Sequence, residues 1–194
     1  MKVILIVATL GLYLSVLGCS NLTGIPLVWK PTSDPYGENT GSYATFPGHR
    51  FKVLPFTDSR ENKTEIAKNV ESSTAKLVTT KDDVSKWCTD RFKDALKLYG
   101  FNLVETGETV QIHGEVIQFH VLEDTRYKGT VSFKISVLTP NNKMLWQGLV
   151  TGSAKRFGRS YSQENYYETL SDAYLVAVQN FLRDESFVKV LRAH

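Results

Sequence analysis

Two cysteines and four histidines are the side chains here that most readily do covalent, acid–base or metal chemistry. Cys88 lies in a helical pattern without a local histidine or cationic partner, so we expect a buried, unpaired thiol rather than a nucleophile. His113 and His120 are an odd number of residues apart in one expected strand. They should face opposite sides and share no metal ion, unless a bulge shifts the register. We therefore expect no metal site and no cofactor.

The segment Asp58-Ser59-Arg60-Glu61 is the best candidate for a local polar site. It follows the first expected strand, where functional loops often lie. An Asp58–Arg60 pair that pins the turn is the structural alternative. An enzyme would need Asp58, Arg60 and Cys88 to converge in a pocket. No phosphate loop, nucleophile elbow or zinc signature is present, so we expect a non-enzymatic protein.

Basic and aromatic residues precede and enter the last long helix of the chain. Lys155, Arg156 and Arg159 form an expected basic loop that could meet acidic lipid headgroups or an acidic partner. A solvated loop is the alternative. Tyr161 and Tyr166 lie outside the apolar stripe of the helix, so they are free to stack on a glycan.

Cys19 ends an uncharged apolar run that extends from Val3 to Leu17. This run suits a signal-peptide core and is shorter than the roughly 20 residues of a membrane span. The tetrapeptide Val16-Leu17-Gly18-Cys19 resembles the lipobox of bacterial lipoproteins. In such proteins the cysteine thiol receives diacylglycerol, the chain is cut before it, and the new N-terminus is acylated. Several acyl chains give durable anchoring.

We therefore expect residues 1–18 to be a signal peptide and Cys19 to be the lipid attachment site. An ordinary secretory signal is the alternative. Ser20 rather than Asp follows the cysteine. By the same resemblance, this implies attachment to the outer membrane, facing the periplasm.

The composition predicts one folded domain, because 42% of the 194 residues are hydrophobic and 22% are charged. A formal net charge of +3 lacks the strong basic bias of nucleic-acid binding, so we expect no nucleic acid partner. Residues 19–50 contain four of the six prolines. We expect them to be the lipidated cysteine and a flexible tether with a reach of about 30 Å. Residues 51–194 should form the single domain.

The periodicity predicts an α+β fold, a two-layer sandwich in the order β-α-β-β-β-α. The sheet should be mostly antiparallel, with two long helices on one face. Pro55 argues that the first strand is peripheral. Thr80 is the expected cap of the first helix, and Gly100 should adopt the left-handed conformation after it. The expected elements are strands 51–56, 110–122, 130–138 and 143–153, helices 81–99 and 163–182, a helical tail 187–191, and a long loop 61–79.

From Phe51 onward the chain resembles the YajG-like family of bacterial outer-membrane lipoproteins. The resemblance rests on the lipobox, the Pro-rich segment, Thr57-Asp58-Ser59-Arg60, Tyr99-Gly100-Phe101 and the Pro140-Asn141-Asn142-Lys143 hairpin. It implies the fold and the location but no reaction. We expect an accessory lipoprotein held in the membrane by acyl chains on Cys19, which binds another envelope protein or stabilises an envelope assembly. A binding module for peptidoglycan, another glycan or lipid is the alternative.

Overall fold

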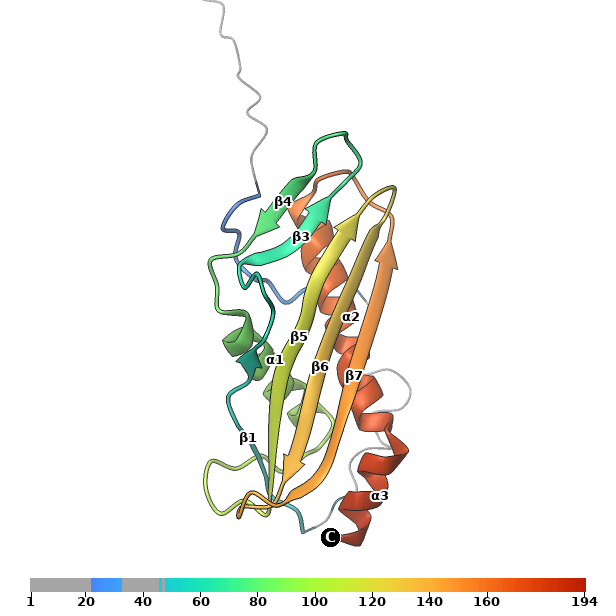
Figure 1. The fold of residues 1–194 in the computed structure, drawn as a ribbon. Helices are drawn as coiled ribbons and strands as arrows, with labels where there is room; N and C mark the ends of the chain where they lie inside the picture. The colour runs from blue at the N-terminus through green and yellow to red at the C-terminus, as the bar shows by residue number, and fades with distance from the viewer. Residues whose placement is uncertain (1–21, 33–45, 47) are drawn as a thin grey trace, which may run out of the picture.

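A computed structural model describes residues 22–32, 46 and 48–194. Its strands and helices form two layers, with the sheet on one side and the helices on the other (Figure 1). The expected signal peptide, Cys19, and residues 33–45 and 47 of the expected tether lie outside the described residues. The elements are β1 (Phe51–Val53), β2 (Thr57–Asp58), β3 (Glu65–Asn69), β4 (Lys76–Thr79), α1 (Val84–Leu98), β5 (Val110–Glu123), β6 (Tyr127–Leu138), β7 (Met144–Arg156), α2 (Gln163–Arg183) and α3 (Glu185–Ala193).

The sheet has the order β4-β3-β5-β6-β7, and the long strands β5, β6 and β7 form an antiparallel meander. One edge of β5 pairs in turn with β1, β2 and β3, and each of these pairings is parallel. Pro55 lies between β1 and β2 and has no N–H to donate, so the pairing with β5 is interrupted between these two strands. The expected α+β class with a mostly antiparallel sheet is confirmed.

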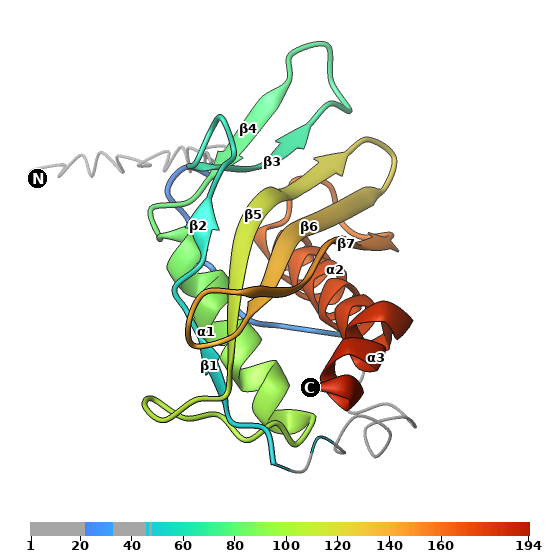
Figure 2. The same ribbon diagram turned by 60° about the horizontal axis from the view of Figure 1, so that its bottom comes forward.

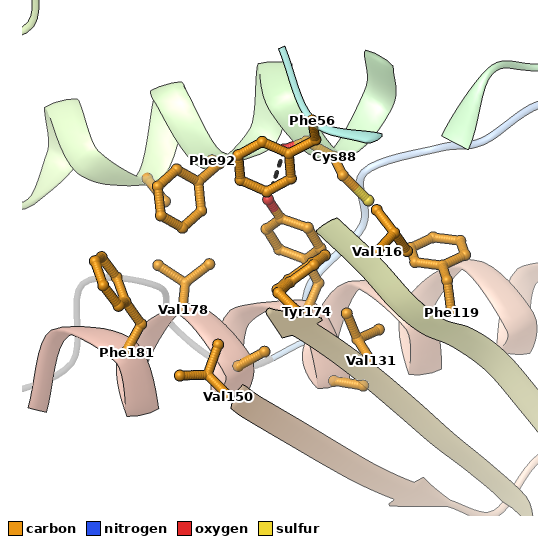
Figure 3. Close-up of a cluster of buried hydrophobic side chains, with 14 of the residues drawn as sticks. Phe56, Cys88, Phe92, Val116, Phe119, Val131, Val150, Tyr174, Val178 and Phe181 are labelled. Carbon is orange, nitrogen blue, oxygen red and sulfur yellow. Dashed lines mark hydrogen bonds between the residues drawn. The ribbon is translucent and has the colours of Figure 1, made fainter. Parts of the chain in front are cut away.

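Helices α1 and α2 pack on the same face of the sheet (Figure 2). Between them lies an apolar core to which the sheet contributes Val116, Phe119 and Val131 (Figure 3). The Tyr174 hydroxyl of α2 donates to the Cys88 carbonyl oxygen of α1 over 2.7 Å and links the two helices. The Cys88 side chain is fully buried in this core, as expected.

The ends of α1 show one expected cap and one difference. Gly100 has φ +79°, its N–H donates to the Lys97 carbonyl, and the next N–H donates to the Leu96 carbonyl, which is a Schellman ending. The N-cap is Asp83, whose carboxylate accepts from the Lys86 N–H over 3.0 Å. The expectation that Thr80 caps the helix is wrong, because the Thr80 hydroxyl accepts from the Asp82 N–H, which lies ahead of the helix.

Residues 61–79 do not form the expected long loop, because they contain the antiparallel hairpin of β3 and β4. A register shift between Glu65 and Ala67 leaves the consecutive residues Ile66 and Ala67 both buried. This bulge hides the alternation by which a strand is recognised in a sequence. The pairing of β3 with β5, far along the chain, supplies the stabilisation that the local sequence lacks.

Residues 22–32, which fall within the expected flexible tether, pack on the domain. Leu22 and Ile25 are buried, and Ile25 forms a parallel bridge with Thr80. The Trp29 ring lies 6.0 Å from the Trp87 ring and 5.8 Å from the Tyr174 ring, measured between centroids. Proline and polar residues suggested flexibility, but the scattered apolar residues find partners on α1 and α2. Within the described part of the chain, packing on the domain therefore already includes residues 22–32, ahead of Phe51.

Candidate interaction surface

One end of the sheet carries a row of lysines and leucines across five strands. In the registers of the sheet, Leu77 of β4 lies opposite Lys68 of β3, and Lys68 lies opposite Leu122 of β5. Leu122 pairs with Lys128 of β6, which pairs with Lys155 of β7. Residues directly opposite in a sheet point to the same face. We call these five side chains the lysine–leucine row.

The row faces away from the helices. The next residues along β5 and β6, Glu123 and Tyr127, are buried on the helix side, whereas Leu77 and Leu122 are 47% and 38% exposed. Among the described residues, Lys68 and Lys155 have no acidic partner within ion-pair distance, and Lys128 pairs with Asp124. A single exposed leucine is ordinary on a protein surface, so the feature of interest is the grouping of leucines with lysines in one row.

Further apolar and basic side chains lie beside the row at the same end of the molecule. Phe157, directly after β7, is 68% exposed, and the Arg126 guanidinium lies 4.1 Å from its ring centroid. Val70 in the β3–β4 turn is 38% exposed. Figure 1 shows the β3–β4 turn, the β5–β6 turn and the end of β7 together at this end. We call the row with Val70, Arg126 and Phe157 the basic end.

A buried carboxylate holds the segment between β7 and α2 at the basic end. The side chain of Glu123 accepts from the Tyr166 hydroxyl and, over 2.8 Å, from the Tyr161 N–H. The Tyr127 hydroxyl donates to the Arg159 carbonyl over 2.7 Å and accepts from the Ser162 N–H. Burial, followed by the hydrogen bond to Glu123, raises the pKa of Tyr166 far above its ordinary value.

The expected tyrosine platform does not form. Tyr166 is fully buried, because its hydroxyl turns inward to Glu123, so the expectation that it is free for a ligand is wrong. Tyr161 is half-buried, its hydroxyl accepts from the Leu22 N–H over 3.1 Å, and Lys76 Nζ lies 4.9 Å from its ring centroid. Helical periodicity alone places Tyr166 outside the apolar stripe of α2. The tyrosine is nevertheless buried, because its hydroxyl donates to the buried Glu123 carboxylate.

The three basic residues expected in one loop, Lys155, Arg156 and Arg159, lie only partly in a loop. Lys155 and Arg156 lie in β7, which runs longer than expected because it pairs with β6 as far as Tyr127. Arg156 turns to the helix side and pairs with Glu168 of α2 over 2.5 Å. Lys155 and Arg159 remain exposed at the basic end.

Asp58 and Arg60 form a nearly buried pair, with side chains 9% and 7% exposed. Arg60 makes two hydrogen bonds to the Asp58 carboxylate and donates to the carbonyls of Lys63 and Glu65 over 2.6 and 2.8 Å. These bonds occupy most of the guanidinium donors and pin the β2–β3 connection. A binding role for the pair stays a prediction.

The two histidines of β5 lie on the same face, contrary to expectation. A bulge between Val116 and Gln118 shifts the register, so both His113 and His120 face away from the helices. His120 Nε2 lies 3.3 Å from a Glu65 carboxylate oxygen, and burial lowers the pKa of His120 despite that neighbour. Within the described part of the chain, no three His, Cys, Asp or Glu side chains gather as a metal site.

Cys88 lies in the core rather than in a cleft. Burial raises the pKa of its thiol well above the ordinary value, which keeps the sulfur protonated. A nucleophilic cysteine needs the thiolate, which this burial disfavours. An enzyme would also need Cys88 to meet Asp58 and Arg60 in a pocket, and the position of Cys88 in the core argues against that.

The described chain starts at the basic end. The Leu22 N–H donates to the Tyr161 hydroxyl, and the Leu22 carbonyl accepts from the Thr79 N–H over 3.0 Å. Cys19 is three residues earlier in the sequence. A fully extended chain advances at most ~3.6 Å per residue, so Cys19 lies within about 11 Å of Leu22. No helix in the described ranges is long and apolar enough to span a membrane.

No protein-family model matches the sequence, and no curated protein matches it significantly. Solved structures do resemble the fold. A Xanthomonas campestris protein of the DUF330 family aligns with a TM-score of 0.55 at 9% identity, over 76% of this chain and 90% of its own. This likeness shows a shared fold and, at that identity, nothing about activity.

Two proteins described as lipoproteins align less closely. A putative lipoprotein from Caulobacter crescentus has a TM-score of 0.46 at 10% identity, over 66% of this chain and 92% of its own. Lipoprotein GNA1162 from Neisseria meningitidis has a TM-score of 0.37 at 14% identity, over 58% of this chain and 88% of its own.

Proposed function

We propose that this protein is a lipid-anchored lipoprotein of the bacterial envelope, attached to the outer membrane through acyl chains on Cys19 and facing the periplasm. Its role is that of a non-enzymatic accessory protein, which binds another envelope protein or stabilises an envelope assembly. The YajG-like resemblance agrees with this location and implies no reaction.

The position of the lipobox relative to the packed chain carries the proposal. Cleavage before Cys19 would remove residues 1–18 and leave every described residue in the mature protein, since the described residues start at Leu22. The proposed cleavage therefore spares Leu22 and Ile25, which are buried in the fold.

The intact mass of the protein purified from membranes tests the anchor. We expect a chain that starts at Cys19 and carries diacylglycerol and an N-terminal acyl chain. The Cys19→Ala variant should carry neither and should keep residues 1–18. An unacylated mature chain released in soluble form would overturn the proposal.

The free edge of the sheet supports a protein partner. Within the described ranges no strand pairs with the outer side of β7, and Leu149 on this strand is 68% exposed. An unpaired edge with an exposed apolar side chain suits docking of a strand from another protein. The glycan-binding alternative is weakened, because Tyr166 is buried.

Photo-cross-linking in intact cells tests the partner site. A cross-linking amino acid in place of Leu149 should give one defined adduct with an envelope protein. The same substitution at Asp94, exposed on α1, serves as the control. The absence of an adduct at Leu149, or equal adducts at both positions, would contradict a partner on the β7 edge.

A further inference from the structure

We propose that the basic end rests on the anionic phospholipid headgroups of the bilayer that holds Cys19. The inference deepens the proposed function and depends on its lipid anchor. The occupant is the membrane surface itself, and the evidence is the place where the chain enters the domain together with the chemistry found there.

The anchor leaves the domain little freedom to stand away from the bilayer. Only residues 20 and 21 separate Cys19 from Leu22, whose backbone is hydrogen-bonded on both sides, to Tyr161 and to Thr79. The acylated cysteine therefore lies within about 11 Å of Leu22, whose partner Thr79 is two residues from Leu77 of the basic end. A tether of about 30 Å, as the composition suggested, would have left the orientation of the domain free.

The side chains at that end match a phospholipid surface. Lysines extend their charged ends to phosphate groups while their stems lie along apolar surface. Lys68 and Lys155 lack acidic partners among the described residues, so both charges are available to phosphates. Leu77, Leu122 and Phe157 project beside them and can enter the boundary between headgroups and acyl chains.

Acidic groups at this end do not cancel the attraction. Glu123 is buried and bonded to two tyrosines, and Asp124 pairs with Lys128. Glu71 is exposed and accepts a hydrogen bond from the Ser160 hydroxyl. Lys68, Lys76, Arg126, Lys155 and Arg159 remain to face the bilayer.

Lysine labelling on vesicles tests the orientation. The acylated protein from membranes is reconstituted into vesicles of phosphatidylcholine, alone or mixed with phosphatidylglycerol. It is then treated with a water-soluble amine reagent, and each lysine is read by peptide mass spectrometry. Lys134, exposed on the same sheet face, and Lys143, exposed at the far hairpin, serve as internal controls.

We expect labelling of Lys68 and Lys155 to fall about fivefold on anionic vesicles relative to neutral ones. Lys134 and Lys143 should not change, and high salt should restore the labelling. Lys128 lies in the same row and should be protected together with Lys68 and Lys155 in the parent protein. In the Lys68→Gln/Lys155→Gln variant, Lys128 should lose this protection. The matched Lys134→Gln/Lys143→Gln variant should keep the protection of Lys128.

Other results would overturn the inference in distinguishable ways. If the protein carries acyl chains and floats with the vesicles but Lys68 and Lys155 stay reactive, the anchor stands and the docking is wrong. Equal protection on neutral vesicles would exclude anionic headgroups as the cause. Protection in native membranes alone would assign the basic end to a protein partner. A protein without acyl chains would refute the proposed function as well.

Discussion

At the scale of single residues, Glu123 organises the basic end. It is 1% exposed, and its carboxylate accepts from the Tyr161 N–H, in the segment that leads into α2, and from the Tyr166 hydroxyl in the first turn of α2. A buried charge without such donors is costly, so the two tyrosines are needed to keep this turn in place. The same turn positions Phe157 and receives Leu22.

Replacing Tyr166 with phenylalanine removes a donor from the buried Glu123 carboxylate. We expect the free energy of unfolding to fall by about 2 kcal/mol, since hydrogen bonds to charged groups are among the stronger ones. Urea denaturation measures the change. Tyr167→Phe is the matched control, because that hydroxyl accepts only from the neutral amide of Gln163. Equal losses in the two variants would argue against a special role of Glu123.

His120 should make stability depend on pH. Its pKa in the fold lies below the ordinary value of 6.5, chiefly because burial disfavours the charged ring. The unfolded chain then binds the proton more readily, so stability falls as pH drops through about 6.5. His120→Gln should lose less stability than the parent between neutral and mildly acidic pH, as urea denaturation at each pH would show. The same slope in both proteins would contradict this.

At the scale of elements, the close approach of α2 to β7 decides how the layers pack. A Cβ atom at Gly152 would lie 2.1 Å from the Ala173 carbonyl oxygen and 2.2 Å from the Ala177 nitrogen. These are backbone atoms of the helix, so they cannot move aside as a flexible side chain could. The glycine therefore permits the helix to lie directly on the strand.

Gly152→Ala should force α2 away from β7 and lower the free energy of unfolding by about 3 kcal/mol. Thermal or urea unfolding would report the loss. The neighbouring exposed substitution Ser153→Ala should change stability by no more than ~0.5 kcal/mol. A well-tolerated alanine at position 152 would show that the two layers can slide apart at little cost.

At the scale of the whole molecule, the proposed anchor at Cys19, three residues before Leu22, would couple anchoring to orientation. The basic end, the β7 edge and α3 have fixed relations to one another (Figure 1). If the basic end rests on the bilayer, the long strands β5, β6 and β7 extend from the bilayer into the periplasm. The β7 edge is then exposed to the periplasm. The lipid contact and the proposed partner site therefore do not compete.

A Gly-Ser spacer inserted between Asn21 and Leu22 should separate these two effects. Acylation and unfolding stability should be unchanged. The protection of Lys68 and Lys155 on anionic vesicles should decrease, because a longer linker lowers the local concentration of the domain at the surface. The same spacer between Asn141 and Asn142, in the far hairpin, should leave that protection intact. Undiminished protection with the first spacer would mean that the basic end docks without help from the anchor.

Local patterns in the sequence were enough to predict the α+β class, the three-stranded meander, both long helices and the burial of Cys88. Each of these follows from the periodicity of contiguous residues or from caps such as Gly100. The lipobox at Cys19 is equally local, and its chemistry stays a prediction.

Only the tertiary structure decided the features that join distant parts of the chain. The β3 strand exists because it pairs with β5, and residues 22–32 are packed because α1 and α2 offer them apolar partners. The bulge at Ile117 places His113 and His120 on one face, and Glu123 draws Tyr166 inward. Such features depend on contacts between residues far apart in the chain, which periodicity cannot report. For the same reason, the lysine–leucine row is recognisable only once five strands are in register.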